Sequence, residues 1–171
     1  TGDWWGNGEP IKISAMRGVA GNRIGDIRNI FFDNITCRGE NAILMYASEE
    51  TKLSNIFFSN FEFILRQSRL DKESGGNFDL RPNLVPGKEI YESEVPVVYI
   101  ENAENINFNQ GNIGWCEVKA GYYTHSIKAF KVNNMNLNNM TVSSSPSNPA
   151  MQAISFVSCT KVTDNTLKTT N

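Results

Sequence analysis

Asn29-Ile30-Phe31-Phe32-Asp33-Asn34 is the stretch that decides the fold, because its pattern returns along the chain. The pattern reads asparagine, apolar, any, apolar, any, asparagine. It recurs at residues 55–60, 105–110 (closed by glutamine) and 134–139, with a degenerate copy at residues 161–165. The apolar positions alternate, which is the period of a β-strand. The first asparagines of the four full copies are separated by 26, 50 and 29 residues, so a unit of about 27 residues repeats and one interval is longer.

A second series of strand-like segments precedes most of these copies, at residues 42–46, 97–100, 127–132 and 153–157. Short strands separated by polar corners predict an all-β parallel β-helix, in which each turn lies on the turn below at a spacing of about 4.8 Å. The chain length divided by the repeat predicts about six coils in a single domain, residues 1–171. Repeated asparagines at one corner would form a ladder of side-chain hydrogen bonds. A β-propeller, with a repeat nearer ~40 residues, and a leucine-rich repeat fit this sequence less well.

The composition bounds the class of protein. The net charge is −2, from 16 Lys and Arg against 18 Asp and Glu, which argues against nucleic-acid binding. No apolar run approaches the ~18 residues of a membrane-spanning helix. Asparagine is a poor helix former, and 22 asparagines in 171 residues disfavour a helical bundle. Three distant cysteines, Cys37, Cys116 and Cys159, together with a single histidine predict buried free thiols rather than a zinc site.

The stretch from Arg66 to Val95 departs from the repeat. It is rich in glycine, proline and charge, so we expect a long loop that leaves the coil at about residues 66–95. Loops of this length are lids, binding walls or surface insertions of low entropic cost, and the sequence leaves these alternatives open. A solenoid also needs caps at its ends. Because no amphipathic helix opens the chain, we expect the solenoid to be truncated at its N-terminal side.

One string near the start is more specific than the repeats. Trp4-Trp5-Gly6-Asn7-Gly8-Glu9-Pro10-Ile11 resembles a segment of bacterial glycoside hydrolase family 28 proteins, the polygalacturonase-like enzymes that degrade pectin. Residues 27–35, 38–43, 78–82 and 98–103 resemble further stretches of that family, so the similarity covers nearly the whole chain. The resemblance implies a right-handed parallel β-helix, a carbohydrate-active parent enzyme, and secretion or export to the periplasm.

The catalytic motifs of that family are missing from this chain. They comprise Asn-Thr-Asp, an adjacent pair of aspartates, Gly-His-Gly and Arg-Ile-Lys, and none of them occurs in the sequence. In family order they precede the Pro10-Ile11 strand, so the resemblance implies that the chain is the C-terminal portion of the enzyme. We therefore expect the catalytic aspartates upstream of residue 1 and no activity from the isolated chain. Met16-Arg17 stands where the family has a late active-site tyrosine, which puts that role in doubt.

Three carboxylates of this chain are weak candidates for catalysis. Inverting glycosidases hold an acid and a base ~6.5–9.5 Å apart across the sugar. The candidates are Glu9, Glu40 and Asp79, and Glu9 and Glu40 are 31 residues apart, close to one coil with an extra corner. The alternative is that these carboxylates are solvated or pair with arginine.

Candidates for substrate binding follow from the chemistry of a polyuronate, which carries one carboxylate per sugar. Arginine binds a carboxylate through two hydrogen bonds, and tryptophan can stack on a sugar face. The candidates are Trp4, Trp5, Glu9, Arg17, Arg38 and Arg81. Each arginine has a structural alternative: Arg38 would pair with Glu40 or with a neighbouring coil, and Arg81 with Asp79.

Three functions stay open at this level. The first is inverting hydrolysis of a pectic polysaccharide by an enzyme whose C-terminal portion is this chain. The second is a non-catalytic, glycan-binding β-helix of the adhesin or tailspike type. The third is a polysaccharide lyase, which would need an acidic cluster for calcium that the sequence lacks. The expected partners are a uronate-containing polysaccharide, upstream coils of the same protein and copies joined end to end, with no cofactor, metal, nucleic acid or membrane span.

Overall fold

The computed structural model describes residues 9–16, 23–67, 77–78, 91–92 and 94–170, and every element in these ranges is a β-strand. The strands are β1 (Lys12–Ala15), β2 (Ile27–Gly39), β3 (Ile43–Ala47), β4 (Leu53–Arg66), β5 (Asn77–Phe78), β6 (Tyr91–Glu92), β7 (Val98–Cys116), β8 (Ile127–Ser143), β9 (Ile154–Val157), β10 (Thr160–Asn165) and β11 (Lys168–Thr170). Except for the antiparallel pair β5–β6, all of them pair in parallel. The predicted all-β class is confirmed.

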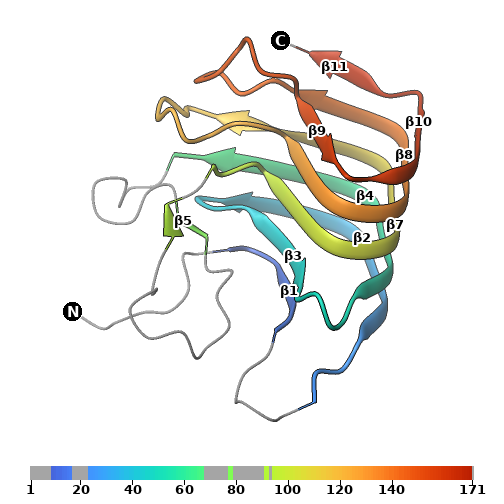
Figure 1. The fold of residues 1–171 in the computed structure, drawn as a ribbon. Coiled ribbons are helices and arrows are strands. Elements are labelled where there is room, and N and C mark those ends of the chain that lie inside the picture. The colour runs from blue at the N-terminus through green and yellow to red at the C-terminus, as the bar shows by residue number, and fades with distance from the viewer. Residues whose placement is uncertain (1–8, 17–22, 68–76, 79–90, 93, 171) are drawn as a thin grey trace.

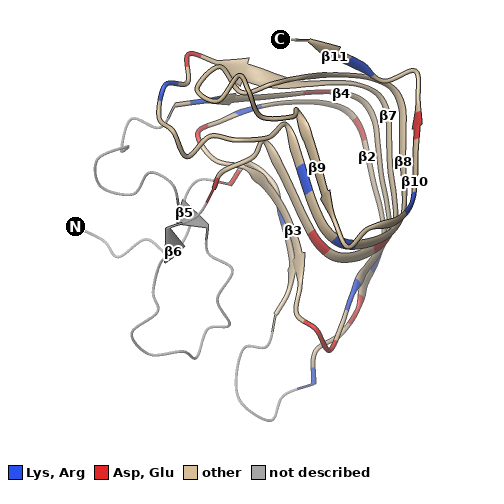
Figure 2. Ribbon diagram, turned by 45° about the horizontal axis from the view of Figure 1, so that its top comes forward, with Lys and Arg blue, Asp and Glu red and all other residues tan. Residues whose placement is uncertain are grey.

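The parallel strands stack as the turns of a solenoid (Figure 1). A first sheet runs in the order β1, β3, β7, β8 and β9, and a second in the order β2, β4, β7, β8 and β10, because β7 and β8 are long enough to serve both. Figure 2 shows these strands following one common curve. The predicted parallel β-helix is confirmed, but it has about four turns rather than six. The prediction was too high because the stretch between β4 and β7 adds no level to the stack.

Left-handed backbone bends at asparagine turn the long strands. Asn29, Asn55, Asn105 and Asn134 have φ between 55° and 62° and share one register position. Asparagine tolerates this conformation better than most residues with a side chain. Nδ2 of Asn55, Asn105 and Asn134 donates to Oδ1 of the asparagine one level below, at 2.9, 3.0 and 2.7 Å respectively. The predicted asparagine ladder is therefore confirmed on β2, β4, β7 and β8, where it fixes the bend at one place, while Lys161 takes this position on β10.

The core consists of inward side chains stacked level on level. The rings of Phe32, Phe58 and Phe108 stack in parallel with centroids 4.6 and 5.0 Å apart. At one bend, the ring of Phe61 on β4 fills the space next to Gly111, its register partner on β7. A Cβ built on Gly111 would lie 2.1 Å from Cζ of Phe61, so only glycine fits there. Packing of this density means that each inward position depends on its neighbours above and below.

The stretch predicted to leave the coil at residues 66–95 begins where β4 ends. The chain rejoins the solenoid at Val95, which pairs with Tyr123. Of the residues between them, the structure describes Gln67, β5, β6 and Glu94, and the rest of the predicted loop lies outside the described residues. Gln67 holds the end of β4 against the turn after β7, because its Oε1 accepts hydrogen bonds from the backbone amides of Lys119 and Ala120.

Candidate functional site

The outward surface of the first sheet carries a group of aromatic and charged side chains, which we call the first-sheet face. On β1, β7 and β8, buried inward residues alternate with outward residues, whereas on β3 the outward Leu44 is fully buried as well. The strand register places the outward residues in two rows across the levels. One row is Lys12, Leu44, Tyr99, Lys128 and Ser155, and the other is Ser14, Tyr46, Glu101, Phe130 and Val157.

Two strong polar contacts lie side by side on this face. The phenol of Tyr99 donates to Oε2 of Glu101 at 2.5 Å, and Nζ of Lys128 donates to Oε2 of Glu94 at 2.6 Å. Tyr99 and Lys128 are register neighbours on β7 and β8, so the two contacts occupy adjacent levels. Together they place a phenol, an ammonium group and two carboxylates on one outward face.

Burial and the contacts themselves fix the charge states of this group. Burial, followed by the hydrogen bond to Glu101, raises the pKa of Tyr99, so the phenol stays protonated. The hydrogen bond from Lys128 lowers the pKa of Glu94, so this carboxylate stays ionised. A general acid or base works best with a pKa near the operating pH. These shifts move both pKa values away from neutral pH. The two groups are therefore better suited to hydrogen bonding with a ligand than to proton transfer.

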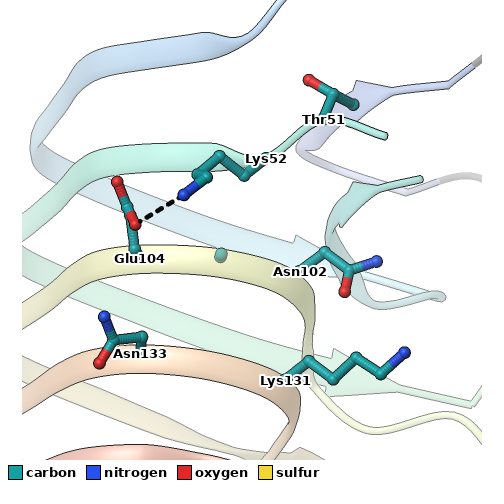
Figure 3. A pocket seen from close by; sticks show the side chains of 7 residues that line it. Thr51, Lys52, Asn102, Glu104, Lys131 and Asn133 are labelled. Carbon is teal, nitrogen blue, oxygen red and sulfur yellow. Dashed lines mark hydrogen bonds and ion pairs between the residues drawn. The ribbon is translucent and has the colours of Figure 1, made fainter. Parts of the chain in front are cut away.

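A pocket of about 290 Å³ lies where β7 and β8 bend out of the first sheet, and we call it the bend pocket (Figure 3). Its lining is Thr51, Lys52, Asn102, Ala103, Glu104, Lys131 and Asn133. Nζ of Lys52 lies 3.0 Å from Oε2 of Glu104, and Nζ of Lys131 lies 3.0 Å from Oε1 of Glu49. The lining is polar except for Ala103, and Figure 3 shows the Lys131 side chain pointing away from Lys52, Glu104 and Asn133.

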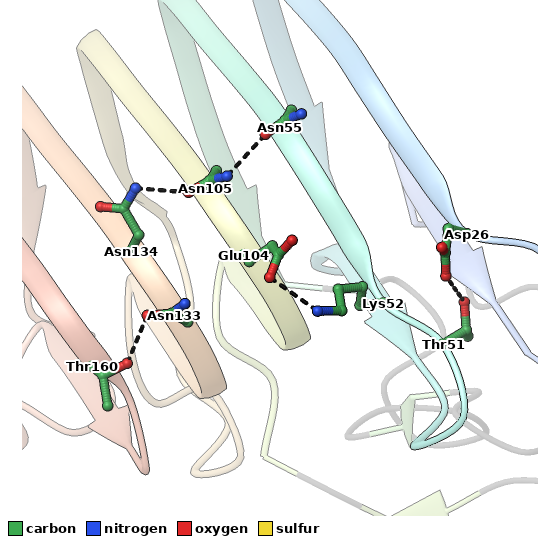
Figure 4. A network of polar contacts seen from close by, with 9 residues as sticks. All are labelled: Asp26, Thr51, Lys52, Asn55, Glu104, Asn105, Asn133, Asn134 and Thr160. Atoms are coloured by element: carbon green, nitrogen blue, oxygen red, sulfur yellow. Dashed lines mark hydrogen bonds and ion pairs between the residues drawn. The ribbon is translucent and has the colours of Figure 1, made fainter.

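A network of hydrogen bonds holds the lining in place (Figure 4). The Thr51 hydroxyl donates to Oδ1 of Asp26 at 2.8 Å, and the Thr160 hydroxyl donates to Oδ1 of Asn133 at 2.9 Å. Asn102 donates through Nδ2 to the carbonyl of Ala47 at 2.6 Å. These bonds join neighbouring levels, so the pocket is built by the stacking of the coils rather than by a single loop.

One residue of the pocket stands in a backbone conformation that does not suit it. Lys131 has a φ of 51° at the same register position as Asn102, whose φ is 53°. A left-handed conformation costs an ordinary L-residue about 1 kcal/mol, and asparagine less. Ser158 and Lys161 have φ of 54° and 53°, so the left-handed conformation belongs to the bends of the solenoid and does not by itself single out Lys131.

Three of the residues selected from the sequence fall among the described residues. Arg38 pairs with Glu62 at 3.2 Å and Glu40 pairs with Arg66 at 3.0 Å, and both pairs join β2 to β4. Arg38 therefore pairs with the neighbouring coil, which was one of its two structural alternatives, and not with Glu40. The chain around half-buried Glu9 lies against that around Glu40, since a Cβ built on Gly39 would be 3.0 Å from Cγ of Pro10. The other candidates lie outside the described residues: Trp4, Trp5, Arg17, Asp79 and Arg81.

The cysteine prediction is partly wrong. All three cysteines are free thiols, but Cys116 is exposed and Cys37 and Cys159 are only half-buried. Cys116 is the last residue of β7; it pairs with Arg66 of β4 and lies beyond the last pair that joins β7 to β8, Ile113 with Val142. Within the described ranges, no group of three His, Cys, Asp or Glu side chains is arranged to hold a metal ion.

The sequence analysis missed the first-sheet face and the bend pocket. The signal available was the outward alternation at residues 97–100 and 127–132, where Tyr99, Lys128 and Lys131 interrupt apolar strands. Alternation marks which positions face outward but does not identify the level on which each one lies. The partners of these residues, such as Glu49 for Lys131, are up to 82 residues away in the chain.

The chain matches no protein-family model, no curated protein and no solved structure. In the part of the chain that the structure describes, no helix is long and apolar enough to cross a membrane. Fold and site together define a class, a parallel β-solenoid with a polar and aromatic outward face and a polar pocket at its bend.

Proposed function

We propose that this chain is the polysaccharide-binding portion of a glycoside hydrolase that acts on pectic or other uronate-containing polysaccharide by inverting hydrolysis. In this proposal the catalytic aspartates belong to a part of the enzyme upstream of residue 1. The chain is expected to be inactive alone and, like enzymes that meet plant polymers, to work after secretion or in the periplasm. The proposal combines the resemblance of the motifs with the chemistry of the first-sheet face.

The observation that carries the proposal is the pair of contacts Tyr99–Glu101 and Lys128–Glu94 on one face. Hydroxyl groups of a sugar pair well with a carboxylate and a phenol, and a uronate carboxylate pairs with an ammonium group. Lys12 and Lys128 stand in the same outward row three levels apart, about 14 Å at the spacing of stacked strands. Leu44, between them in this row, is fully buried, so Lys128 rather than the whole row is the cation proposed to meet a uronate carboxylate.

A second candidate function, glycan binding without catalysis, is favoured by the partners that Glu40, Glu94 and Glu101 have in the structure. Glu40 and Glu94 are held by Arg66 and Lys128, and Glu101 accepts from Tyr99. An acid and base pair needs one protonated and one ionised carboxyl group near neutral pH. Carboxylates that are already held by a cation or a phenol fit ligand binding in either function.

The test is to incubate the purified chain with polygalacturonate and rhamnogalacturonan and to follow reducing ends and the ultraviolet absorbance of unsaturated uronate. We expect neither product, together with retention on immobilised polygalacturonate but not on a neutral galactan. Lys128→Met should weaken retention, whereas Lys168→Met on β11, which removes the same charge elsewhere, should not. Unsaturated product would replace the hydrolase by a lyase, and absence of retention would contradict polysaccharide binding on this face.

End-to-end association is a further part of the proposal. The outer edge of β2 exposes apolar groups, since Phe31 is 71% exposed and the inward residues Ile30, Phe32 and Ile35 are only partly buried. An edge strand of this kind is a template for pairing with another strand. Further coils of the same protein or other copies of the chain are the partners expected there.

A further inference from the structure

Glu101 on the first-sheet face is a carboxylate whose hydrogen-bond partner is a neutral group. Its side chain is half-buried on β7, and its Oε2 accepts from the phenol of Tyr99 at 2.5 Å. In the part of the chain that the structure describes, no Lys or Arg forms an ion pair with Glu101. Five other glutamates each pair with a lysine or an arginine at 2.6–3.2 Å: Glu40, Glu49, Glu62, Glu94 and Glu104.

The phenol of Tyr99 does not supply the missing counter-charge. Burial, and then the hydrogen bond and the charge of Glu101, raise the pKa of Tyr99, so the phenol stays a neutral donor. A carboxylate that is partly removed from water is costly unless a cation pairs with it. A cation from outside the described strands would therefore gain more at Glu101 than at a glutamate that already has a basic partner.

Two aromatic residues flank Glu101 in its outward row. The register places Tyr46 of β3 on one side and Phe130 of β8 on the other, each one level away at a spacing of about 4.8 Å. Aromatic rings attract cations to their faces. Nζ of Lys131, which Glu49 holds at 3.0 Å, lies 5.1 Å from the centroid of the Phe130 ring. One ring beside Glu101 is therefore already in contact with an ammonium group.

This combination of groups selects the charge of a ligand and the kind of ammonium it carries. The carboxylate and the rings all attract a cation and disfavour an anion. Tyr99 bonds to Oε2 of Glu101, so Oε1 can accept a hydrogen bond from a ligand N–H. A primary ammonium group offers that N–H, whereas a quaternary one has none.

We propose that Glu101, with Tyr46 and Phe130 on either side, binds the primary ammonium group of a small organic amine. The carboxylate pairs with the ammonium group, the rings flank it, and Tyr99 holds the carboxylate in place. We call these residues the ammonium site. The inference does not rest on the proposed function, which assigns a uronate carboxylate to Lys128 in the other outward row of the same face.

The chain offers a matched pair of charge variants for the test. Glu101→Gln keeps an oxygen that can accept from Tyr99 and removes the charge. Glu62→Gln makes the same change on β4, where Glu62 forms an exposed pair with Arg38. Exposed pairs contribute little to stability, and Glu101→Gln removes a charge that has no cation, so neither variant should melt at a markedly lower temperature. Phe130→Leu keeps an apolar side chain and removes one ring.

Nuclear magnetic resonance titration at pH 7 with n-butylammonium, n-butanol and tetramethylammonium measures binding to the unmodified chain and to the three variants. We expect butylammonium to bind at least about tenfold more tightly than butanol and more tightly than tetramethylammonium. Glu101→Gln should weaken butylammonium binding at least about tenfold, Phe130→Leu about threefold, and Glu62→Gln should leave it unchanged.

Three results would count against the ammonium site. Equal binding of butanol and butylammonium, or equal effects of the two glutamine variants, would overturn the proposal. Tetramethylammonium binding more tightly than butylammonium would overturn the assignment to a primary ammonium group. An Nα-acetyl-lysine amide that binds more than about tenfold more tightly than butylammonium would replace the small amine by a protein side chain.

The outcomes also separate this proposal from the proposed function. Retention on polygalacturonate that depends on Lys128, without binding of butylammonium, would refute the ammonium site and leave the polysaccharide proposal standing. Binding of butylammonium that depends on Glu101, without retention on the polymer, would support the ammonium site and contradict polysaccharide binding.

Discussion

Replacing Asn105 by alanine tests the asparagine ladder at its centre. Asn105 donates to Oδ1 of Asn55 at 3.0 Å and accepts from Nδ2 of Asn134 at 2.7 Å. Losing two such hydrogen bonds costs about 2 kcal/mol in total. Alanine at a φ of 55° adds about 1 kcal/mol of backbone strain. Asn105→Ala should therefore lower the free energy of unfolding by about 3 kcal/mol.

Two further substitutions separate these contributions. Asn105→Gly loses the same hydrogen bonds without strain in the folded state, so its loss should be smaller than that of alanine, although glycine also favours the unfolded chain. Asn109→Ala removes an outward asparagine of β7 that is not at a left-handed bend, and it should change stability by less than about 0.5 kcal/mol.

Urea denaturation followed by far-ultraviolet circular dichroism provides the measurement, with the shift in midpoint compared at a constant slope. The expected order of stability is unmodified chain, then glycine, then alanine at position 105. If Asn105→Ala is no more destabilising than Asn109→Ala, the ladder does not stabilise the solenoid. If glycine is less stable than alanine, the argument from backbone strain is wrong.

Three other predictions follow from the core, the first-sheet face and the edge of β2. Gly111→Ala should lower the free energy of unfolding by about 1–3 kcal/mol, because its Cβ would lie 2.1 Å from Cζ of Phe61, and the loss measured in urea should shrink in a Phe61→Ala background. The Glu94–Lys128 pair lowers the pKa of Glu94, so its contribution is complete above the ordinary glutamate pKa of about 4.3 and is lost as the pH falls through the lower folded-state value. Lys128→Met should therefore flatten the acid side of a plot of melting temperature against pH, and an unchanged acid side would contradict the pairing. Phe31→Asn should reduce end-to-end association in light scattering, since Phe31 is 71% exposed, and a monodisperse monomer before substitution would refute association through this edge.

The fold was predictable from the sequence because its determinants are local. Asn29, Asn55, Asn105 and Asn134 mark the bends directly, since few other residues accept a left-handed backbone at low cost. The alternating apolar positions between the bends then define the inward face. The number of turns was not predictable from these marks alone, because residues 66–95 consume chain length without adding a level.

The candidate site was not predictable, because it depends on which levels become neighbours. Tyr99 and Glu101 are two residues apart and could have been paired from the sequence, but Lys128 reaches Glu94 across 34 residues and Lys131 reaches Glu49 across 82. These distances follow from the length of every intervening coil and loop. The resemblance implied a binding role for Arg38, which the structure places in an exposed pair with Glu62.

In this solenoid, the requirements of folding leave the outward positions free. Inward residues must fit the level above and below, and bend residues must accept a left-handed backbone, so both are constrained by stability. Outward residues bear neither constraint, and the chemistry of Tyr99, Glu101 and Lys128 is found there. Bend positions are not limited to asparagine either, since Lys131, Ser158 and Lys161 have φ between 51° and 54°. The outward chemistry is therefore the part of this solenoid that folding explains least, and the first-sheet face is the sharper test of what this protein binds.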